Sequence, residues 1–271
     1  MLPFRSIAIA ATLSAVVTIA PAAAQAPQAN RNPVLVELFT SEGCSSCPPA
    51  DALLAKLDKD QPIEGAEIII LGEHVDYWDQ QGWHDRFSSH QYTERQNDYG
   101  ERLHVQNVYT PQMIVDGTEQ FLGNDAAHAQ KAIQHAAQGS KLSLSLSKPV
   151  VDGRKVSASV SLSASPASQP RGDLYAALVD PVDVTDVRKG ENGGKRLQHA
   201  GVVRSLQRVG SLKNLGTGPV SFSLTAPADT KPDEMRLVVF AQQSGPGAVL
   251  GAVSGPVSGA ASGTATASLT H

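Results

Sequence analysis

The chain has 271 residues, 41% of them hydrophobic, and a formal net charge of −4. This length and composition support one large domain or two ordinary ones and exclude a miniprotein that depends on disulfides for its stability. The 22 basic residues are outnumbered by 26 acidic ones and are not clustered, which argues against a nucleic acid as partner because phosphate binding needs grouped Lys and Arg.

Residues 1–24 are predicted to be a signal peptide. Arg5 supplies a positive charge, residues 7–20 form an uncharged apolar run, and alanines precede the predicted cleavage after Ala24. The alternative is an uncleaved membrane anchor, but the run is shorter than the roughly 20 residues that span a bilayer, and Pro21 follows it at once. No later stretch is apolar enough to span. We therefore expect a periplasmic or secreted protein with no membrane span after cleavage.

A flexible lead-in is predicted at 25–32, and an ordered α/β region at 33–139. Apolar runs indicate buried strands, whereas Leu53, Leu54 and Leu57 recur at helical spacing. The expected order is strand, helix, strand, helix, strand, strand, helix, over residues 34–39, 47–59, 68–71, 89–103, 113–115, 119–122 and 125–138. This order predicts a mixed sheet flanked by helices.

The pattern changes after Gly139. Apolar and polar residues alternate in short segments separated by turn residues, which is typical of half-buried strands. Strands are expected over residues 142–146, 156–162, 173–180, 202–209, 220–224, 235–242 and 249–253. The sequence therefore predicts an all-β sandwich domain over 140–253, followed by a disordered tail over 254–271.

Both cysteines of the chain lie in one tetrapeptide, Cys44-Ser-Ser-Cys47. A disulfide across two residues closes a very small loop and removes little entropy from the unfolded chain, so stability is a poor reason for this pair. A cysteine at the start of a helix has a lowered pKa, because the helix amides stabilise the thiolate that attacks disulfides. We expect Cys44 to be the nucleophile and Cys47 the more buried resolving cysteine.

The same spacing also supplies half of a zinc site, which is the structural alternative. A four-ligand site would need two further ligands in a compatible arrangement. The sequence has no second cysteine pair and no pair of histidines at a suitable spacing. A redox-active disulfide is therefore favoured, with a protein or small-molecule thiol or disulfide as substrate and no other cofactor.

Several long motifs resemble the DUF1223 family of secreted bacterial proteins. They are LVELFTSEGCSSCPPAD at 35–51, EHVDYWD at 73–79, TERQ at 93–96, VYTPQMIVDG at 108–117, GENGGKRLQH at 190–199 and VVR at 202–204. The resemblance covers roughly residues 33–253. It supplies no reaction, because the family is one of unknown function, and it gives His199 and Arg204 no role beyond packing or a hydrogen bond between domains.

The N-terminal region is also similar to the wider thioredoxin superfamily. That similarity implies a cis-proline facing the disulfide, and Thr110-Pro111 stands at the matching position. It further implies a buried acid behind the disulfide that exchanges a proton with Cys47. Glu37 is the candidate, seven positions before Cys44 and one more than in thioredoxin, so a solvated or loop-facing Glu37 stays open as the alternative.

A polar segment that includes His74 follows the predicted strand 68–71. One interpretation joins His74 to Cys44 and Cys47 as a copper site, because thiolates and imidazole suit that metal. The alternative is a structural turn. Three classes of function follow from the sequence: a thiol–disulfide oxidoreductase, which is favoured, a periplasmic copper-binding chaperone, and a thioredoxin-fold interaction module with an idle disulfide.

Overall fold

The structure is a computed structural model that describes residues 31–164 and 171–258. The predicted signal peptide at 1–24 lies outside the described residues, as does most of the lead-in at 25–32. Within the described part of the chain, no helix combines the length and apolar character needed to cross a membrane.

The first half of the chain alternates between strands and helices in the predicted order. Every element begins within two residues of its predicted start. The elements are β1 (Asn32–Thr40), α1 (Pro48–Asp60), β2 (Ala66–His74), α2 (His90–Arg102), β3 (Gln112–Val115), β4 (Glu119–Leu122) and α3 (Ala126–Ala136). The predicted α/β character with a mixed sheet is therefore confirmed.

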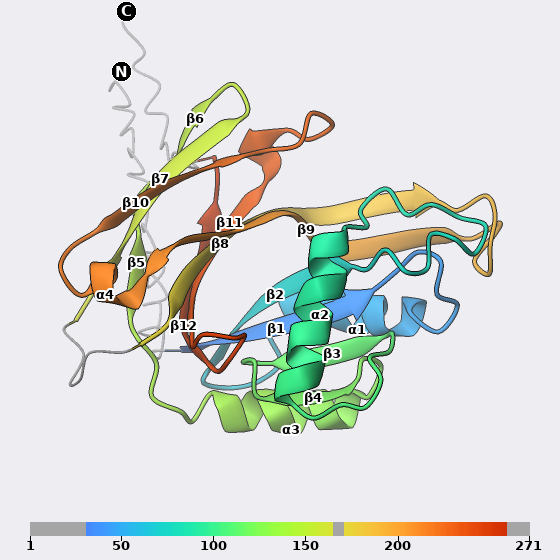
Figure 1. Cartoon of the computed structure of the whole chain (residues 1–271), viewed down its shortest axis with the longest axis horizontal. Coiled ribbons are helices and arrows are strands. Elements are labelled where there is room, and N and C mark those ends of the chain that lie inside the picture. The colour runs from blue at the N-terminus through green and yellow to red at the C-terminus, as the bar shows by residue number, and fades with distance from the viewer. Residues whose placement is uncertain (1–30, 165–170, 259–271) are drawn as a thin grey trace, which may run out of the picture.

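Strand β1 is buried on both faces, which explains its continuous apolar sequence. Val34, Val36 and Leu38 point to one face, where they pack with residues of α1 and α3. Side chains alternate along a strand, so Leu35 and Glu37 point to the opposite face, the face that α2 covers (Figure 1). The loop that carries the two cysteines joins the end of β1 to α1.

The second half is rich in strands. Its elements are β5 (Leu144–Leu146), β6 (Val150–Asp152), β7 (Lys155–Leu162), β8 (Asp173–Asp186), β9 (Arg196–Ser211), α4 (Leu212–Leu215), β10 (Val220–Thr225), a 3-10 turn (Pro232–Glu234), β11 (Arg236–Gln242) and β12 (Val249–Pro256). All the predicted strands are present, whereas β6 and α4 were not predicted. Strand β12 also continues to Pro256, which corrects the prediction that the tail begins at residue 254, because its partner β11 pairs with it over that length.

One eight-stranded sheet joins the two halves of the chain, in the order β12-β11-β8-β9-β2-β1-β3-β4. The link is a parallel contact between β2 and β9, where Gly72 lies opposite Val202. Glycine suits this close approach, since a β-carbon at position 72 would lie 3.1 Å from the carbonyl oxygen of Ala200. The sheet thus runs across residue 139, the predicted boundary between two domains.

A second sheet, in the order β10-β7-β5 with β6 paired to β7, packs against the β8 and β11 end of the large sheet. Apolar side chains from both sheets meet in one core, among them Val156, Val160 and Leu224 from the small sheet and Leu178 and Leu237 from the large one. This core is separate from the one beneath α1 and α3.

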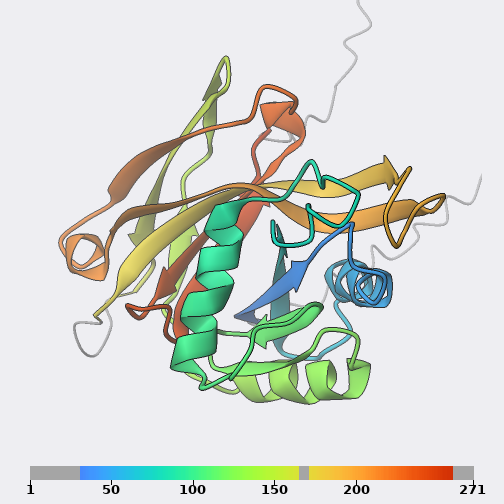
Figure 2. The ribbon, with the colours of Figure 1, turned by 45° about the vertical axis from the view of Figure 1, so that its right-hand side comes forward.

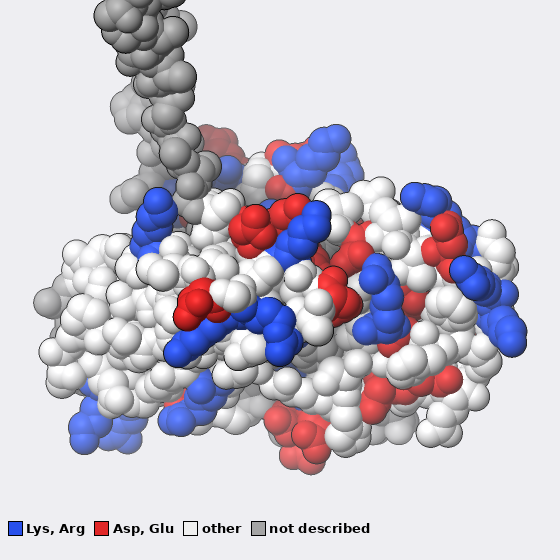
Figure 3. All heavy atoms as spheres, turned by 90° about the horizontal axis from the view of Figure 1, so that it is seen from above, with Lys and Arg blue, Asp and Glu red and all other residues white. Residues whose placement is uncertain are grey.

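Strands β8 and β9 extend beyond their neighbours as a long hairpin. Their pairing continues from Asp180 opposite Val202 to Asp186 opposite Arg196, well past the ends of β11. Figures 1 and 2 both show the end of this hairpin beside the loop that follows β1. We call residues 187–195 the hairpin tip. Viewed from above, the molecule carries acidic and basic side chains interspersed over its face (Figure 3).

Candidate functional site

Cys44 and Cys47 form a disulfide at the junction between β1 and α1, with their α-carbons 5.4 Å apart. The backbone turns between them, and the Cys47 amide donates a hydrogen bond of 3.2 Å to the Cys44 carbonyl. Cys47 is the N-cap of α1, and Pro48 occupies the first helical position, where the missing amide hydrogen costs nothing. The pair therefore lies at the positive end of the helix dipole, as the sequence predicts.

Neither cysteine has any exposed surface, although Ser45 and Ser46 between them are exposed. The hairpin tip covers the pair. Asn192 donates two hydrogen bonds of 2.9 Å, one to the carbonyl of Glu42 and one to that of Cys44. Nearby, the tip carboxylate Glu191 accepts a hydrogen bond of 3.1 Å from the Ser45 amide. The C-terminal half of the chain thus closes directly over the disulfide.

A second segment, residues 75–89 between β2 and α2, closes the site from another side; we call it the insert. A β-carbon added at Gly43 would lie 3.1 Å from the β-carbon of Trp78, so this side chain packs against the cysteine loop. Trp83 donates a hydrogen bond of 2.7 Å to the Glu42 carboxylate. The insert also contacts the hairpin tip, where a β-carbon at Gly190 would lie 3.2 Å from that of Trp83.

The structure places Thr110 and Pro111 next to the cysteine loop, and the peptide bond between them is cis. Thr110 accepts a hydrogen bond of 2.8 Å from the Trp78 indole, which itself packs on the loop. A β-carbon at Gly123 would lie 3.0 Å from that of Pro111 and 3.1 Å from that of Ala50, three residues after Cys47. Both predicted residues therefore lie beside the first turn of α1.

Glu37 is not brought together with the cysteines. It points to the sheet face opposite α1, where the Arg95 guanidinium lies 2.6 Å from its carboxylate and the Tyr99 hydroxyl donates a hydrogen bond of 2.5 Å to it. Gln242, from β11, extends the same network by donating a hydrogen bond of 2.8 Å to Tyr99. Glu37 thus has a full set of partners on the wrong face for proton exchange with Cys47, and it takes no part in the site described below.

A buried group of charged residues next to the disulfide was not predicted. His199, from β9, lies between two carboxylates, with its Nε2 atom 3.6 Å from Glu42 Oε1 and its Nδ1 atom 3.6 Å from Asp51 Oδ2. Its ring also packs edge-to-face on that of His74 at 4.8 Å between centroids. His74 in turn pairs with Asp85 at 2.7 Å. We call these five residues the His199 cluster, and all are at least 95% buried.

The His199 cluster perturbs two pKa values. Burial alone would lower the pKa of His199, but the carboxylates of Asp51 and Glu42 overcome it and raise this pKa to about 10. For Asp85 the directions are reversed: burial alone would raise its pKa, but His74 and two backbone amides lower it to about 2. His199 is therefore an imidazolium at neutral pH.

The chain was also compared with known protein families and solved structures. The sequence profile described as "Protein of unknown function (DUF1223)" matches residues 35–242, which include both the cysteine loop and His199. The chain belongs to the DUF1223 family. An X-ray crystal structure of a protein from Agrobacterium tumefaciens is similar to this DUF1223 protein, with a TM-score of 0.62 and 29% identity over 88% of this chain and 97% of that one. No curated protein matches.

The copper alternative gains no support in this DUF1223 protein. Both sulfur atoms are bonded to each other, and His74 uses Nδ1 for Asp85 while its Nε2 atom has no hydrogen-bond partner. Among residues 31–164 and 171–258, no three His, Cys, Asp or Glu side chains are arranged as metal ligands.

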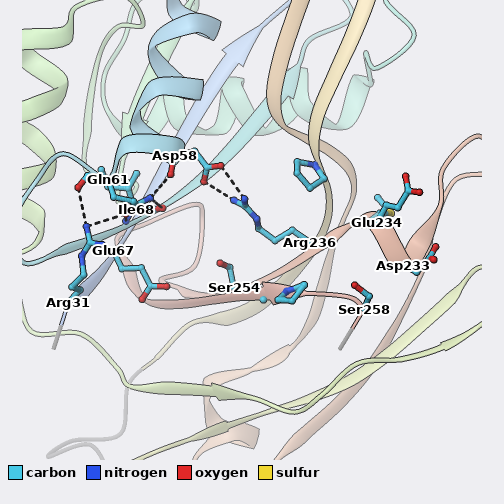
Figure 4. Close-up of a pocket in the computed structure, with 14 residues that line it drawn as sticks. Arg31, Asp58, Gln61, Glu67, Ile68, Asp233, Glu234, Arg236, Ser254 and Ser258 are labelled. Atoms are coloured by element: carbon cyan, nitrogen blue, oxygen red, sulfur yellow. Dashed lines mark hydrogen bonds and ion pairs between the residues drawn. The ribbon is translucent and has the colours of Figure 1, made fainter. Parts of the chain in front are cut away.

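A surface hollow of about 1070 Å³ lies away from the disulfide. It is lined by residues near the start of β1 and β2, whereas the cysteines follow the other end of β1. Its two arginines already have partners, since Arg236 pairs with Asp58 at 2.7 Å and Arg31 donates to Gln61 (Figure 4). Nothing in this hollow points to chemistry.

Proposed function

We propose that this chain is an exported thiol–disulfide oxidoreductase-like protein, with Cys44 as nucleophile and Cys47 as resolving cysteine. One observation carries the proposal. The only two cysteines of the chain form a disulfide at the start of a helix, where the backbone amides favour a thiolate. Thr110 and Pro111, beside the first turn of α1, would border an extended substrate peptide.

The exchange conserves atoms and electrons in two steps. A substrate thiolate attacks Sγ of Cys44 and forms a mixed disulfide, while the bond to Cys47 breaks and Cys47 leaves as a thiolate that takes up a proton. The second thiol of the substrate then attacks the substrate sulfur that is bonded to Cys44. The substrate disulfide forms and Cys44 leaves as a thiolate. The substrate gains one disulfide and the Cys44–Cys47 pair gains two electrons. The reverse sequence reduces a substrate disulfide.

Two features of the fold support the finer architecture expected from the sequence. Strand β1 pairs parallel to β2 and antiparallel to β3, with α1 and α3 on one face and α2 on the other, which supports a thioredoxin-like region at 33–139. The two sheets that share the second core support a β-sandwich region after residue 139. Export to the periplasm or medium rests on residues 1–24, and it would place the pair where disulfides persist.

The burial of both cysteines adds a requirement to this function. A substrate sulfur must approach Sγ of Cys44 in line with the disulfide, and that atom has no exposed surface. The hairpin tip is held to the cysteine loop by the bonds of Asn192 and Glu191, which are few and local. We therefore propose that the tip and the insert move apart before exchange, and that the described arrangement is the closed form.

The test is disulfide exchange with a peptide that carries two thiols, in a glutathione buffer. The wild-type protein should form the peptide disulfide faster than the buffer alone, and Cys44→Ala should abolish the acceleration. The variant His135→Gln, on the exposed side of α3, is the matched control that should keep the full rate. Equal rates for wild-type and Cys44→Ala would overturn the proposal and leave a module with an idle disulfide.

A further inference from the structure

His199 contacts acidic groups on both sides of the disulfide. Glu42 stands two positions before Cys44, and Asp51 stands four positions after Cys47. The imidazole of His199 lies 3.6 Å from a carboxylate oxygen of each. A side chain from the C-terminal half of the chain is therefore inserted between the two acids that flank the cysteine pair.

Asp51 brings this contact close to Cys47. The Asp51 amide donates a helical hydrogen bond of 3.1 Å to the Cys47 carbonyl, so the two residues are one helical turn apart. Residues at this spacing share a helix face, with β-carbons about 5–6 Å apart. Both are buried, and His199 packs against Asp51 on that face. The charge on His199 thus lies beside a carboxylate one helical turn from Cys47, in a buried region where charges interact more strongly than in water.

The contacts of His199 are long, and this separates it from a structural ion pair. Neither ring nitrogen has a hydrogen-bond partner, nor has Oε1 of Glu42, although these atoms are buried. The groups that face its ring are Asp51 from α1, Glu42 from the cysteine loop and His74 from β2, with Asp85 of the insert beyond His74. Unpaired buried polar atoms cost stability, so the arrangement is poorly explained by stability alone.

We propose that His199 sets the acidity of the Cys44 and Cys47 thiols, and through it the redox potential of the pair, as a fixed cation in the closed site. It touches no reacting atom and is a positioning residue that acts through its field. The inference rests on the proposed function, because it takes the pair to be redox-active.

The physical reason is the difference between the two redox states. The disulfide is neutral, whereas the reduced pair has a thiolate form that a nearby cation stabilises. Stabilising the reduced form makes the pair more oxidising. Removing the cation leaves the carboxylates of Glu42 and Asp51 uncompensated, and these disfavour a thiolate. Removing one carboxylate instead leaves the imidazolium in place, and this favours the thiolate.

The test measures the equilibrium of the protein with glutathione, where two glutathione thiols become one glutathione disulfide as the Cys44–Cys47 bond is reduced to two thiols. His199→Gln should shift the equilibrium roughly tenfold toward the protein disulfide, which corresponds to a potential about 30 mV more negative. Asp51→Asn should shift it in the opposite direction. The double variant restores the net charge and should lie near wild-type. His135→Gln is the matched control, expected to leave the equilibrium unchanged.

A second measurement uses the ultraviolet absorbance of the thiolate in the reduced proteins. The apparent thiol pKa should be higher in His199→Gln and lower in Asp51→Asn than in wild-type. A purely structural loss would move both variants in the same direction. If His199→Gln does not fold, the shift in Asp51→Asn decides alone.

Shifts of the same sign in both variants, or no shift in either, would overturn the inference. This result can be told from a failure of the proposed function. If opposite shifts occur but wild-type does not accelerate peptide oxidation, His199 tunes the pair and the enzymatic role is wrong. If wild-type accelerates peptide oxidation but neither His199→Gln nor Asp51→Asn shifts the glutathione equilibrium, the enzymatic role stands and the tuning by His199 is wrong.

Discussion

Two buried charge clusters lie on either side of β1, and they are built differently. On the α2 side, direct hydrogen bonds of 2.5–3.1 Å join Glu37, Arg95, Tyr99 and Gln242, which we call the Glu37 cluster. At the end of the strand, His199 meets its two carboxylates only at 3.6 Å, and both its nitrogens lack partners. Glu37 is therefore fully hydrogen-bonded, whereas His199 has charged neighbours but no hydrogen bond to either of them.

The difference indicates what each cluster does. A satisfied network fixes one arrangement of the elements that it joins, here β1, α2 and β11. A cluster with unpaired atoms beside a disulfide is poor at that task but keeps a cation close to the sulfurs. We therefore assign the Glu37 cluster to stability and the His199 cluster to the chemistry of the cysteines.

The largest effect is expected from Arg95→Met, which leaves the fully buried Glu37 without its partner. Breaking a buried ion pair from one side typically costs about 3–5 kcal/mol, because an uncompensated charge remains. Urea unfolding of the oxidised protein measures the loss. The glutathione equilibrium of the variant should equal that of wild-type.

The control for this prediction is the double variant Arg95→Met with Glu37→Gln, which removes both charges. It should recover a large part of the lost stability. A change in redox potential in Arg95→Met comparable with that in His199→Gln would erase the distinction between the clusters.

The second prediction concerns pH and His199. Its pKa is raised to about 10 in the folded protein, so the stability that it contributes is full below its unfolded pKa near 6.5 and is lost as pH rises toward 10. The free energy of unfolding of wild-type, relative to His199→Gln, should fall by about 2 kcal/mol between pH 7 and pH 9. Urea unfolding across this range measures the difference. A constant difference would mean that His199 is not held as an imidazolium.

The third prediction concerns the closure of the site. Asn192→Ala removes the two hydrogen bonds from the hairpin tip to the cysteine loop, each worth about 1 kcal/mol. The closed form should be less favoured by about 2 kcal/mol, so dithiothreitol should reduce the disulfide up to roughly thirtyfold faster. Asn97→Ala, at an exposed position on α2, is the control. An unchanged rate for Asn192→Ala would show that the tip does not limit access.

The smallest effect is expected from Glu73→Gln, at a buried carboxylate that lies 3.5 Å from Arg95 and has no hydrogen-bond partner. Burial raises the pKa of Glu73 well above its usual value, against the pull of Arg95, so folding at neutral pH is coupled to proton uptake by this side chain. The stability that it contributes is present below about pH 4.5 and is lost as pH rises through the folded pKa. Urea unfolding should show the variant to be more stable than wild-type at pH 8 and equal to it at pH 4.

The elements of the fold could be predicted because their signals are local. The apolar run of β1, the leucine spacing of α1 and the Asp116-Gly117 turn each lie within a few residues. The contact of β2 with β9 could not be predicted, since it joins positions about 130 residues apart through one pair, Gly72 and Val202. Only the glycine at position 72 gives a sequence signal, and it becomes meaningful once the partner strand is known.

Glu37 shows why the site was only partly predicted. Its spacing from Cys44 is one residue longer than in thioredoxin, and one residue along a strand moves a side chain to the other face of the sheet. The alternation in β1 therefore places Leu38, not Glu37, on the face of α1. The Cys44–Cys47 disulfide and the cis bond before Pro111 could be anticipated because short motifs set these positions.

His199 carries no local signal of its role. It follows the hairpin tip by four residues, and its acidic partners lie about 150 positions earlier in the chain. The motif at 190–199 marked the segment, but only the folded hairpin brings it over the cysteine loop.

The central claim is that Cys44 exchanges disulfides with a substrate, and the most direct measurement is trapping. Expressed from the full sequence, residues 1–24 included, Cys47→Ala should accumulate mixed disulfides through Cys44, seen as slower bands on non-reducing gels that disappear on reduction. The variant with both cysteines replaced by alanine should show none. If Cys47→Ala yields no such adducts while Cys44 remains a free thiol, the account of a redox-active pair is contradicted.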